Sequence, residues 1–416
     1  MRDKLKVGIL SLGCPRNLVD SEGILGRLNL KGYPVVEITK ADIALVNTCS
    51  FIEEAKQESI EAILDLADLK AEGRLKKIIV YGCLSQRYKD CLRKELPEID
   101  AFVGCSSLNH SKARFSLTPR HYAYLKICES CVNNCSFCVI PKLKGRFNSL
   151  EMGSILDKVD EFNASGLAEL NIIGQDITGY GLDLYGSPSL ARLLKEIIKK
   201  AHNIGWLRLL YLYPNRVTEE LLEIIKSFQK VCKYIDLPIQ HINNRLLKLM
   251  HRDTNKKEIL ALIDKIRKVI PGVALRTSLI VGFPSETDKE FSELLDFIGE
   301  AKFERLGAFI YSQEEGTPAA DFKAQLPQKI KVERFNQLMQ AQQKISEEVN
   351  RRFLGRTLEV LIDQKERGHY LGRTQFDAPE VDGLVFVNSK KELNIGDFVE
   401  VKINSTLEYD LAGEAL

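Results

Sequence analysis

The sequence predicts an α/β protein of several domains, and three observations support this prediction. The chain has 416 residues, and at roughly 100–200 residues per domain this length indicates two to four domains. Short apolar runs alternate with longer helical patterns over most of the chain, which is typical of repeated βα units. From residue 357 apolar and polar residues alternate, which indicates a small antiparallel β-barrel. We expect three domains, with boundaries at 1–115, 116–352 and 353–416.

The composition is that of an ordinary globular protein. Hydrophobic residues make up 44% of the chain and charged residues 28%, which excludes the disordered and fibrous classes. The 59 Lys and Arg residues almost balance the 57 Asp and Glu residues. The chain as a whole therefore lacks the excess of positive charge that a protein needs to coat a polyanion such as nucleic acid. No apolar run is long enough to span a bilayer, and Val7–Leu12 is shorter than the core of a signal peptide. We therefore expect a cytoplasmic protein with no membrane partner.

The first 105 residues contain short runs rich in Val and Ile that are continuously apolar. Such runs are typical of strands buried on both faces of a parallel sheet, so this part is expected to be doubly wound, like flavodoxin. No G-x-G-x-x-G motif follows the first run, so a dinucleotide site is not supported. The expected elements are strands at Lys6–Leu10, Ile43–Asn47 and Lys77–Tyr81, and helices at Asn17–Leu30 and Ile52–Leu69.

Three of the ten cysteines stand at equivalent places in this pattern. Cys14, Cys49 and Cys83 each lie at or just after the carboxyl end of a predicted strand. In an open α/β sheet these ends form one rim, where ligands bind, so the three thiols could share a site. The alternative is that each is a small buried apolar residue. Cys91 and Cys105 lack this placement and are interpreted as structural.

A second, compact cysteine pattern lies in the middle of the chain. Cys131, Cys135 and Cys138 form C-x3-C-x2-C directly after the strand-like run His121–Ile127. Cys128 adds a fourth thiol, but zinc sites usually separate two C-x2-C pairs by a dozen or more residues, so this dense spacing fits an iron–sulfur cluster better. Three ligands on a four-iron cluster would leave one iron open to a substrate. A zinc site is the alternative.

The C-x3-C-x2-C motif, with Phe137 before its last cysteine, resembles the radical S-adenosylmethionine (SAM) superfamily. This resemblance implies that the open iron binds SAM, which is then cleaved reductively to a 5′-deoxyadenosyl radical. Independently, the repeated βα units between about 120 and 325 indicate a partial TIM-type barrel, with the cysteine loop after its first strand. The expected barrel strands are His121–Ile127, Leu170–Gly174, Trp206–Tyr211, Tyr234–Pro238, Ala274–Gly282 and Arg305–Tyr311.

Several longer stretches resemble one family within that superfamily, the methylthiotransferases. They are SLGCPRNLVDSE (11–22), VNTCSFIEEAK (46–56), YGCLSQRY (81–88), LTPRHYAYLKI (117–127), LPIQH (237–241), LRTSLIVGFPSET (275–287) and YSQEEGTPAA (311–320). They are closest to the branch that modifies an aspartate of small-subunit ribosomal protein twelve. The sister branch, which modifies tRNA adenosine, is the alternative. The resemblance implies that Cys14, Cys49 and Cys83 hold a second 4Fe–4S cluster, in agreement with the rim argument.

The resemblance also implies where SAM binds. The strand end that carries Gly174 and Gln175 and the turn from Gly282 to Glu286 are expected to line the SAM pocket together with Phe137. The alternative for the two glycines is that they merely end strands. His241 is interpreted as a wall residue of this pocket and not as a proton donor or acceptor.

The chain departs from the family pattern at a few positions. Cys128 stands where the family usually has Ser or Ala, and Ser130 where it usually has Gly. After the cysteine motif, a basic R-G-x-x-R-S pattern is represented by Lys144–Ser149, in which Lys144 replaces the first arginine and Asn148 the second. We expect Cys128 to be no cluster ligand.

The C-terminal region predicts an amphipathic helix at 328–352, interpreted as a connector, and then the β-barrel, which resembles the TRAM domain of the family. Residues 356–416 contain seven Lys and Arg but twelve Asp and Glu. Such an acidic barrel would repel phosphate and attract a basic protein. Asp377, Glu380 and Asp382 are expected to meet that partner. Ordinary solvated surface charge is the alternative.

Together these patterns predict an oxygen-sensitive radical SAM methylthiotransferase with two 4Fe–4S clusters and SAM. One cluster, held by Cys131, Cys135 and Cys138, is expected to generate the radical that removes hydrogen from the β-carbon of an aspartate. The other is expected to carry the sulfur that replaces this hydrogen, and a second SAM would supply the methyl group. The expected partners are ribosomal protein twelve and an electron donor such as flavodoxin or ferredoxin, with tRNA less favoured. From another class, a non-catalytic zinc or iron–sulfur RNA-binding protein remains open.

Overall fold

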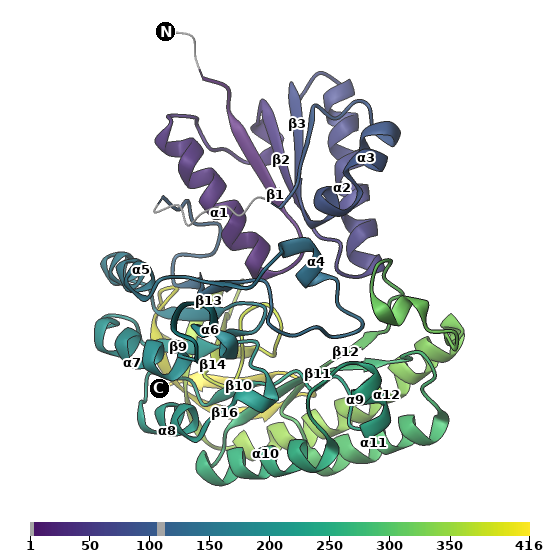
Figure 1. The fold of residues 1–416 in the computed structure, drawn as a ribbon. Helices are drawn as coiled ribbons and strands as arrows, with labels where there is room; N and C mark the ends of the chain where they lie inside the picture. The colour runs from purple at the N-terminus through teal and green to yellow at the C-terminus, as the bar shows by residue number, and fades with distance from the viewer. Residues whose placement is uncertain (1–3, 106–112) are drawn as a thin grey trace. The chain divides into compact units, whose positions relative to one another are not determined.

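The computed structural model describes residues 4–105 and 113–416 (Figure 1). The chain packs as two compact units, which we describe separately. Unit 1 contains residues 1–119, 129–148 and 314–317, and unit 2 contains residues 120–128, 149–313 and 318–416. The division into three domains at residues 115 and 352 stays a prediction. Among the helices of the described chain, none has both the length and the apolarity needed to cross a bilayer.

Unit 1 is built on a parallel sheet of four strands in the order β1-β2-β3-β4. The strands are β1 (Val7–Ser11), β2 (Ile43–Thr48), β3 (Lys77–Gly82) and β4 (Ala101–Val103), and the helices are α1 (Pro15–Leu30), α2 (Glu53–Ala71) and α3 (Cys83–Glu95). Val35, between α1 and β2, forms an isolated parallel bridge with Val7 on the outer edge of β1. This bridge stands where flavodoxin has its second strand, so the flavodoxin-like prediction is confirmed with that strand reduced to one residue.

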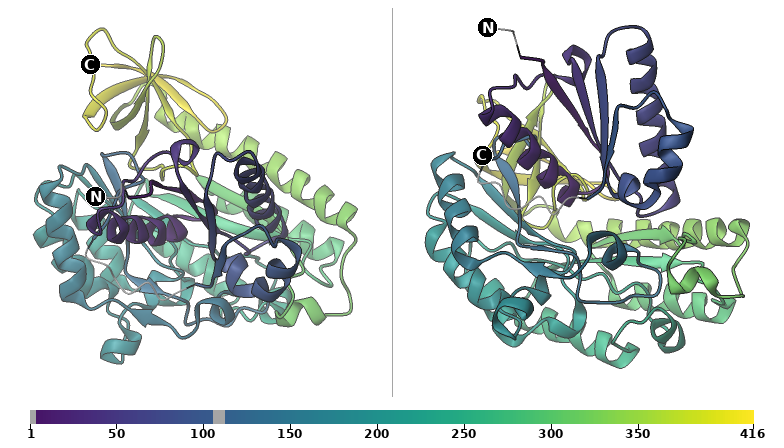
Figure 2. Two further views of the ribbon diagram at one scale, coloured as in Figure 1. Left: turned by 90° about the horizontal axis from the view of Figure 1, so that it is seen from above. Right: turned by 45° about the horizontal axis from the view of Figure 1, so that its top comes forward.

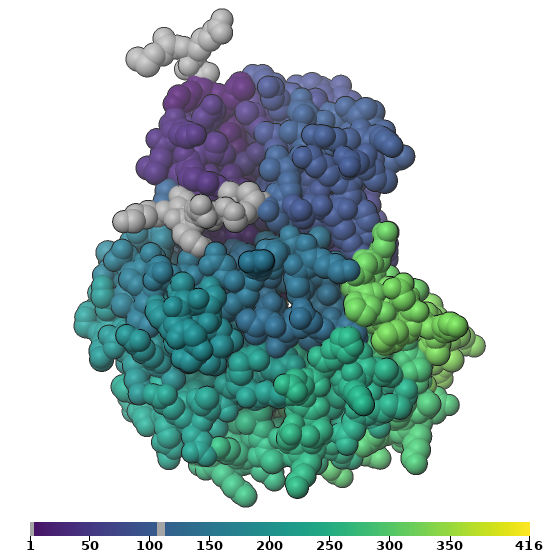
Figure 3. All heavy atoms as spheres, viewed as in Figure 1, coloured from purple at the N-terminus to yellow at the C-terminus, as the bar shows by residue number. Residues whose placement is uncertain are grey.

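Two apolar clusters lie on opposite faces of this sheet, because alternate residues of a strand point to opposite sides. On β2, Ala44 and Val46 pack with Ile63 of α2. Leu45 packs instead with Leu25 of α1. Figure 1 shows α1 on one side of the sheet and α2 and α3 on the other, and on the face drawn in Figure 3 this part of the chain forms one closely packed body. The doubly wound prediction is therefore confirmed.

Unit 2 contains six parallel barrel strands in two groups. One sheet has the order β5-β8-β9 and the other the order β10-β11-β12, and a single bridge from Leu207 in β9 to Val231 extends the first sheet. All six expected strands are present: β5 (Tyr122–Lys126), β8 (Glu169–Ile173), β9 (Trp206–Leu209), β10 (Tyr234–Asp236), β11 (Ala274–Val281) and β12 (Arg305–Ile310). The sheet is open between β5 and β12, as expected for a partial barrel.

Helices follow these strands, as in other βα barrels, and Figure 1 shows α7, α8 and α10 on the outer side of the strands. The helices of unit 2 are α5 (Met152–Ala164), α6 (Leu182–Tyr185), α7 (Leu190–Lys200), α8 (Glu219–Ser227), α9 (Asn244–Leu249), α10 (Lys256–Val269), α11 (Asp288–Ala301) and α12 (Gln328–Asn350). The segment between the short strands β6 (Cys128–Glu129) and β7 (Asn148–Ser149) carries the C-x3-C-x2-C motif, followed by α4 (Ile140–Lys144).

The C-terminal part of unit 2 is a closed barrel with the strand order β13-β14-β15-β17-β16. Its strands are β13 (Thr357–Lys365), β14 (Tyr370–Thr374), β15 (Val385–Asn388), β16 (Phe398–Thr406) and β17 (Leu411–Ala415). Four pairings are antiparallel as predicted, but β15 and β17 run parallel. The number of strands explains this difference, because strict alternation of direction cannot close around a ring of five. Figure 2 shows α12 leading to this barrel.

Buried ion pairs join this barrel to the βα core within unit 2. Glu169 at the start of β8 accepts hydrogen bonds from Arg208 at 2.7 Å and pairs with Arg373 of the barrel at 2.8 Å, and all three side chains are almost completely buried. Arg373 also pairs with Asp363 at 2.7 Å. The barrel is therefore fixed to the core by charges that are costly to separate.

The same junction corrects the expectation for the acidic residues of the barrel. The Asp377 carboxylate is buried and accepts from Arg305 at 2.8 Å. The Asp382 carboxylate accepts from the Tyr234 hydroxyl at 2.6 Å. Only Glu380 is exposed, and it accepts from a tyrosine hydroxyl of β5. The prediction that these three carboxylates meet a basic partner is wrong for Asp377 and Asp382, because a charge count does not show which charges are paired internally.

Candidate functional site

The three N-terminal cysteines lie at the ends of three neighbouring strands of unit 1. Cys14 caps α1 after β1, Cys49 follows β2, and Cys83 begins α3 after β3. The pKa of Cys49 is raised, first by burial and also by the nearby Cys14. The pKa of Cys83 is raised, first by its hydrogen bond with Cys105 and by burial, with a smaller effect of Cys49. The structure thus brings these three thiols to one rim, as the pattern predicted.

Two glycines allow the close approach of these strand ends. Gly13 has a φ of 86°, and a Cβ at this position would lie 2.7 Å from the Cβ of Cys49. Gly82 has a φ of 103°, and its Cβ would lie 2.7 Å from the carbonyl oxygen of Thr48. Both positions combine a left-handed backbone with a space that no side chain can enter. The glycines before Cys14 and Cys83 are therefore part of the site.

Arg16 places a positive charge beside the first of these thiols. Its Nε donates to the Sγ of Cys14 at 3.4 Å. Burial acts to raise the pKa of Cys14, but the Arg16 guanidinium and the backbone N–H groups of Arg16 and Asn17 lower it below its usual value. A thiolate is the form that binds metal, so Arg16 favours the ligand form of Cys14. The sequence motif contained Arg16, but its role was not predicted.

The C-x3-C-x2-C motif forms a tight loop between β6 and α4. The N–H of Cys138 donates to the carbonyl of Cys135 at 3.1 Å, and the side chain of Asn133 donates to the Sγ of Cys131 at 3.3 Å. Burial, followed by the neighbouring Cys135 and Cys131, raises the pKa of Cys138 to about 12. Phe137 is half-buried in the same loop.

The donor set of both cysteine groups fits iron–sulfur ligation. All six cysteines are free thiols, and each group can supply three sulfur ligands. Within the described residues, no three His, Cys, Asp or Glu side chains are already spaced as ligands of a single metal ion. The ligands of a four-iron cluster each bind a different iron, so they need not have that spacing.

Both cysteine groups belong to unit 1. Val139 and Leu143, which follow the C-x3-C-x2-C motif, pack against Cys83 and Cys105 in one small apolar cluster. The radical-type motif is thus packed against the N-terminal domain, although the sequence analysis assigned the two to different domains. Only the three-dimensional structure shows this relationship.

A short segment from far along the chain completes unit 1. The Glu314 carboxylate is buried, lies 2.5 Å from Nη1 of Arg87 and lies 3.3 Å from Nζ of Lys56. Arg87 also donates to the carbonyl of Ser50, directly after Cys49, at 3.1 Å. Lys142 of α4 donates to the carbonyl of Gly316. These contacts give residues 314–317 of the YSQEEGTPAA stretch a structural role in unit 1.

In unit 2, Gly174 lies directly against Cys128. A Cβ on Gly174 would lie 2.5 Å from the Sγ of Cys128, and this sulfur lies 3.7 Å from the carbonyl oxygen of Asp176. Cys128 is almost completely buried, so it fills the space beside a strand end. Gln175, the next residue after Gly174, is half-buried.

The turn after β11 is held by a buried carboxylate. Glu286 accepts from the N–H of Gly282 at 2.8 Å, from the imidazole Nε2 of His241 at 3.1 Å and from Arg334 of α12 at 2.5 Å. The Nδ1 of His241 accepts from the N–H of Asn243 at 2.9 Å, so the ring proton lies on Nε2. That His241 lines a SAM pocket stays a prediction. The contact of Glu286 with Arg334 gives α12 a role that the connector interpretation missed.

Left-handed backbone at residues other than glycine occurs at several of these strand ends. Tyr211 follows β9, Gln240 follows β10 and Ser285 follows β11, with φ of 66°, 72° and 65°. Such residues carry strain that often accompanies functional sites. They lie at the carboxyl ends of barrel strands, where the active sites of βα barrels are found.

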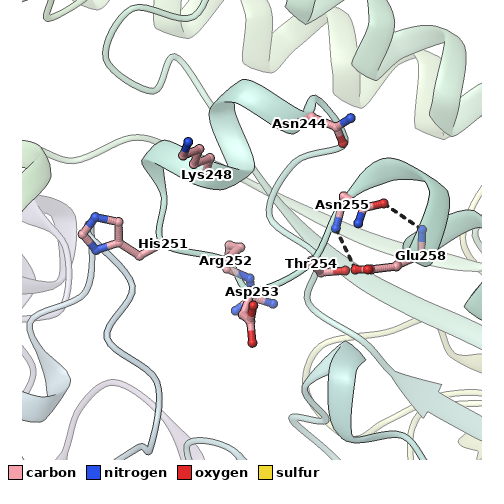
Figure 4. A pocket seen from close by; sticks show the side chains of 8 residues that line it. All are labelled: Asn244, Lys248, His251, Arg252, Asp253, Thr254, Asn255 and Glu258. Carbon is pink, nitrogen blue, oxygen red and sulfur yellow. Dashed lines mark hydrogen bonds between the residues drawn. The ribbon is translucent and has the colours of Figure 1, made fainter.

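A polar pocket of about 500 Å³ opens between α9 and α10. Figure 4 shows Lys248, His251 and Arg252 around it, with Asn255 and Glu258 joined by two hydrogen bonds at the start of α10. The Arg252 guanidinium stacks on a tyrosine ring at 4.1 Å and donates to the carbonyl of Pro238, just beyond β10. The pocket thus lies near the carboxyl end of β10, and its lining carries both basic side chains (Lys248, Arg252) and acidic ones (Asp253, Glu258). The sequence analysis did not predict it.

Comparison with known proteins matches family models to three parts of the chain. Residues 6–104 match Uncharacterized protein family UPF0004, residues 125–298 match the Radical SAM superfamily and residues 354–416 match the TRAM domain. The chain is 46% identical to the ribosomal protein uS12 methylthiotransferase RimO of Clostridioides difficile (strain 630), over 99% of both chains. It is also 46% identical to RimO of Thermoanaerobacter sp. (strain X514), over 98% of this chain and 99% of that one.

Solved structures show the same fold at low sequence identity. The radical S-adenosylmethionine methyltransferase TsrM from Kitasatospora setae is 14% identical, with a TM-score of 0.53 over 76% of this chain and 77% of that chain. The cobalamin-dependent S-adenosylmethionine radical enzyme OxsB is 12% identical, with a TM-score of 0.51 over 82% of this chain and 56% of that chain. At this identity the likeness concerns the fold alone.

Proposed function

This chain belongs to the RimO family of ribosomal protein uS12 methylthiotransferases and is therefore a radical SAM methylthiotransferase; we propose that its product is uS12 with a methylthio group on the β-carbon of an aspartate. The iron–sulfur and SAM dependence expected from the cysteine motif agrees with this membership. Two clusters, their ligands and the modified carbon are parts of the proposal.

Cys131, Cys135 and Cys138 would hold the first 4Fe–4S cluster. When bound, this cluster would supply the one-electron reduction by which SAM yields a 5′-deoxyadenosyl radical. Two hydrogen bonds shape the loop that holds these thiols. The side chain of Asn133 donates to the Sγ of Cys131, and the N–H of Cys138 donates to the carbonyl of Cys135. By the resemblance, Phe137, Gly174, Gln175, Gly282 and Glu286 would shape the SAM pocket. The structure supports an indirect part for Glu286, whose carboxylate orders the turn that begins at Gly282.

Cys14, Cys49 and Cys83 would hold the second 4Fe–4S cluster, as the carrier of the transferred sulfur. Gly13 and Gly82 let the three strand ends approach, and Arg16 stabilises the thiolate of Cys14. Separate sites suit this reaction, because an unactivated C–H bond needs a radical while the sulfur must wait nearby on another carrier.

One structural observation carries this proposal: the two cysteine groups belong to the same compact unit. A non-catalytic zinc or RNA-binding protein does not require that a second cysteine group pack beside the first. The polar pocket between α9 and α10 does not add to this argument, because its lining carries Asp253 and Glu258 as well as Lys248 and Arg252.

The tRNA alternative is disfavoured by the family membership, with many RimO relatives near 46% identity over the full chain. The charge of the barrel no longer contributes to this choice, because Asp377 and Asp382 are occupied by internal partners. We also propose that the protein acts in the cytoplasm and receives electrons from a small donor such as flavodoxin or ferredoxin, since its substrate is a ribosomal protein.

The test is anaerobic reconstitution of the full chain with iron and sulfide, followed by reaction with SAM, a reductant and uS12. The proposal expects about eight irons per chain and a methylthio mass increase on an aspartate of uS12, with no modification of bulk tRNA. Cys131→Ala should abolish 5′-deoxyadenosine formation, whereas Cys49→Ala should leave this cleavage intact and abolish transfer. Zinc without iron, or modification of tRNA instead of uS12, would overturn the proposal.

A further inference from the structure

Lys144, at the end of α4, is a buried cation between two carboxylates. Its side chain is 8% exposed, and its Nζ lies 3.3 Å from an oxygen of Asp20 and 3.3 Å from an oxygen of Glu129. A buried ammonium group is costly unless it is paired. This position therefore has a specific electrostatic requirement, which a surface lysine lacks.

The two partners of Lys144 belong to different parts of unit 1. Asp20 lies in α1, the helix that begins after Cys14. Glu129 lies two residues before Cys131, and Lys144 lies six residues after Cys138. The pair with Glu129 thus closes the base of the loop that carries the radical-type cysteines, and the pair with Asp20 attaches this loop to the helix that carries Cys14.

Apolar and backbone contacts support the same attachment. Val139 and Leu143 pack against Cys83, and Lys142 donates to the carbonyl of Gly316. Apolar packing alone is non-directional and tolerates sliding. The ion pairs of Lys144 add directional contacts: the pair with Asp20 fixes the end of α4 to α1, and the pair with Glu129 fixes it to the base of its own loop.

We propose that Lys144 is a positioning residue that holds the two cysteine sites at a fixed separation, so that the radical and the sulfur reach the same substrate carbon. This inference rests on the proposed function for the identity of the groups at the two sites. The reaction requires such a device, because removal of hydrogen and delivery of sulfur occur on one atom but start from two sites. Misplacement by about 1 Å can lower a rate by roughly a hundredfold.

The test uses the anaerobically reconstituted full chain with Lys144→Met, Asp20→Asn and Lys144→Arg. Lys40→Met serves as the control, because Lys40 forms an exposed pair with Glu37 in the same unit. The first readout is the number of 5′-deoxyadenosine molecules formed per methylthiolated uS12. The second is the magnetic interaction between the two reduced clusters, measured by electron paramagnetic resonance. The third is hydrogen exchange of residues 129–148 in the chain without iron.

Lys144→Met and Asp20→Asn are expected to bind iron like the wild type and to cleave SAM, but to form roughly tenfold more 5′-deoxyadenosine per product. Their magnetic interaction should change, and exchange in 129–148 should rise. Lys144→Arg keeps the positive charge, so all three readouts should equal those of the wild type. If Lys144→Met fails to bind iron, the inference is tested with Asp20→Asn instead. This variant removes only the pair between Lys144 and α1 and leaves the pair with Glu129 in place.

An unchanged product ratio and magnetic interaction in the iron-loaded Asp20→Asn variant would overturn the inference. A lack of rescue by Lys144→Arg together with normal iron content would do the same. Failure of the proposed function gives a different result, because then the wild type itself would bind fewer than about eight irons or leave uS12 unmodified.

Discussion

The Sγ atoms of Cys83 and Cys105 lie 3.8 Å apart. Cys83 is fixed at the first turn of α3, while Cys105 follows β4 and is half-buried. The sequence analysis interpreted Cys105 as structural because it stands outside the strand-end pattern of the other three. It nevertheless touches a thiol that is proposed to bind iron. Both thiols are free, and one oxidation step would join them.

We expect hydrogen peroxide to form a Cys83–Cys105 disulfide in the chain without iron. The two thiols lose two electrons and two protons, and peroxide is reduced to water. Mass spectrometry after alkylation and digestion should find these two cysteines linked, with exposed Cys91 still alkylated. The disulfide should prevent iron uptake at the N-terminal site until a reductant is added. Recovery of a Cys49–Cys83 link instead would contradict this prediction.

Gly82→Ala is expected to prevent assembly of the N-terminal site. The added Cβ would meet the carbonyl of Thr48 at 2.7 Å, at a φ that strains any residue with a side chain. The variant should bind about four irons instead of eight, because the C-x3-C-x2-C loop does not depend on this turn. Gly73→Ala is a suitable control, since Gly73 also has a positive φ but open space around it. Full iron content in Gly82→Ala would show that the turn adapts.

Gly174→Ala should lower SAM cleavage, and Cys128→Ala should partly restore it. A Cβ on Gly174 would lie 2.5 Å from the Sγ of Cys128, and removal of this sulfur frees the space. Cys128→Ala alone should change SAM cleavage little, since Cys128 is not expected to bind the cluster. A double-mutant cycle of SAM cleavage measures the coupling between the two positions. If the effects of the two substitutions on SAM cleavage are additive, the contact between residue 174 and Cys128 does not limit SAM cleavage.

Arg373→Met is expected to destabilise the protein by about 3–5 kcal/mol, because it leaves Glu169 and Asp363 buried with one partner fewer. Urea unfolding measures this change. Lys365→Met, which removes an exposed pair with Glu392 on the same barrel, should cost less than about 1 kcal/mol. Equal effects of the two substitutions would contradict a special role of the buried pairs.

Stability should depend on Glu290 at acid pH. The hydrogen bond from Arg245 lowers the pKa of Glu290 to about 2 from its usual value of 4.5. Because the folded state has the lower pKa, the stabilisation is complete above the unfolded value and is lost as the pH falls from about 4.5 towards 2. Since Arg245 is partly exposed, we expect a contribution of about 1 kcal/mol. Urea unfolding of Glu290→Gln between pH 2 and pH 6 should lack this part of the pH dependence.

The sequence predicted those features that depend on local pattern. Continuous apolar runs located the barrel and sheet strands, and their ends placed Cys14, Cys49 and Cys83 on one rim. The spacing of Cys131, Cys135 and Cys138 identified the second group without any knowledge of the fold. The strands were predicted correctly because strand periodicity is a property of neighbouring residues. The ligand roles of the two cysteine groups stay a prediction.

Features that depend on distant residues could not be predicted in this way. Lys144 and Asp20 are 124 residues apart, and Arg305 and Asp377 are 72 residues apart. A composition count treated Asp377 as surface charge, although it is buried against an arginine. The parallel pairing of β15 with β17 also escaped prediction, because strand alternation shows which residues face inward but gives no strand order.

The assembly of unit 1 from three chain segments has a consequence for synthesis on the ribosome. Its sheet is complete once residue 103 has emerged, and a domain of this kind can fold while later residues are still being added. Arg87, however, meets Glu314, which lies 227 positions further along the chain. At about 5–20 residues per second, the nascent sheet domain must wait at least about ten seconds for this carboxylate. During that interval Arg87, which donates to the carbonyl of Ser50 beside Cys49, lacks its buried carboxylate partner, so the part of unit 1 next to Cys49 is completed only late in translation.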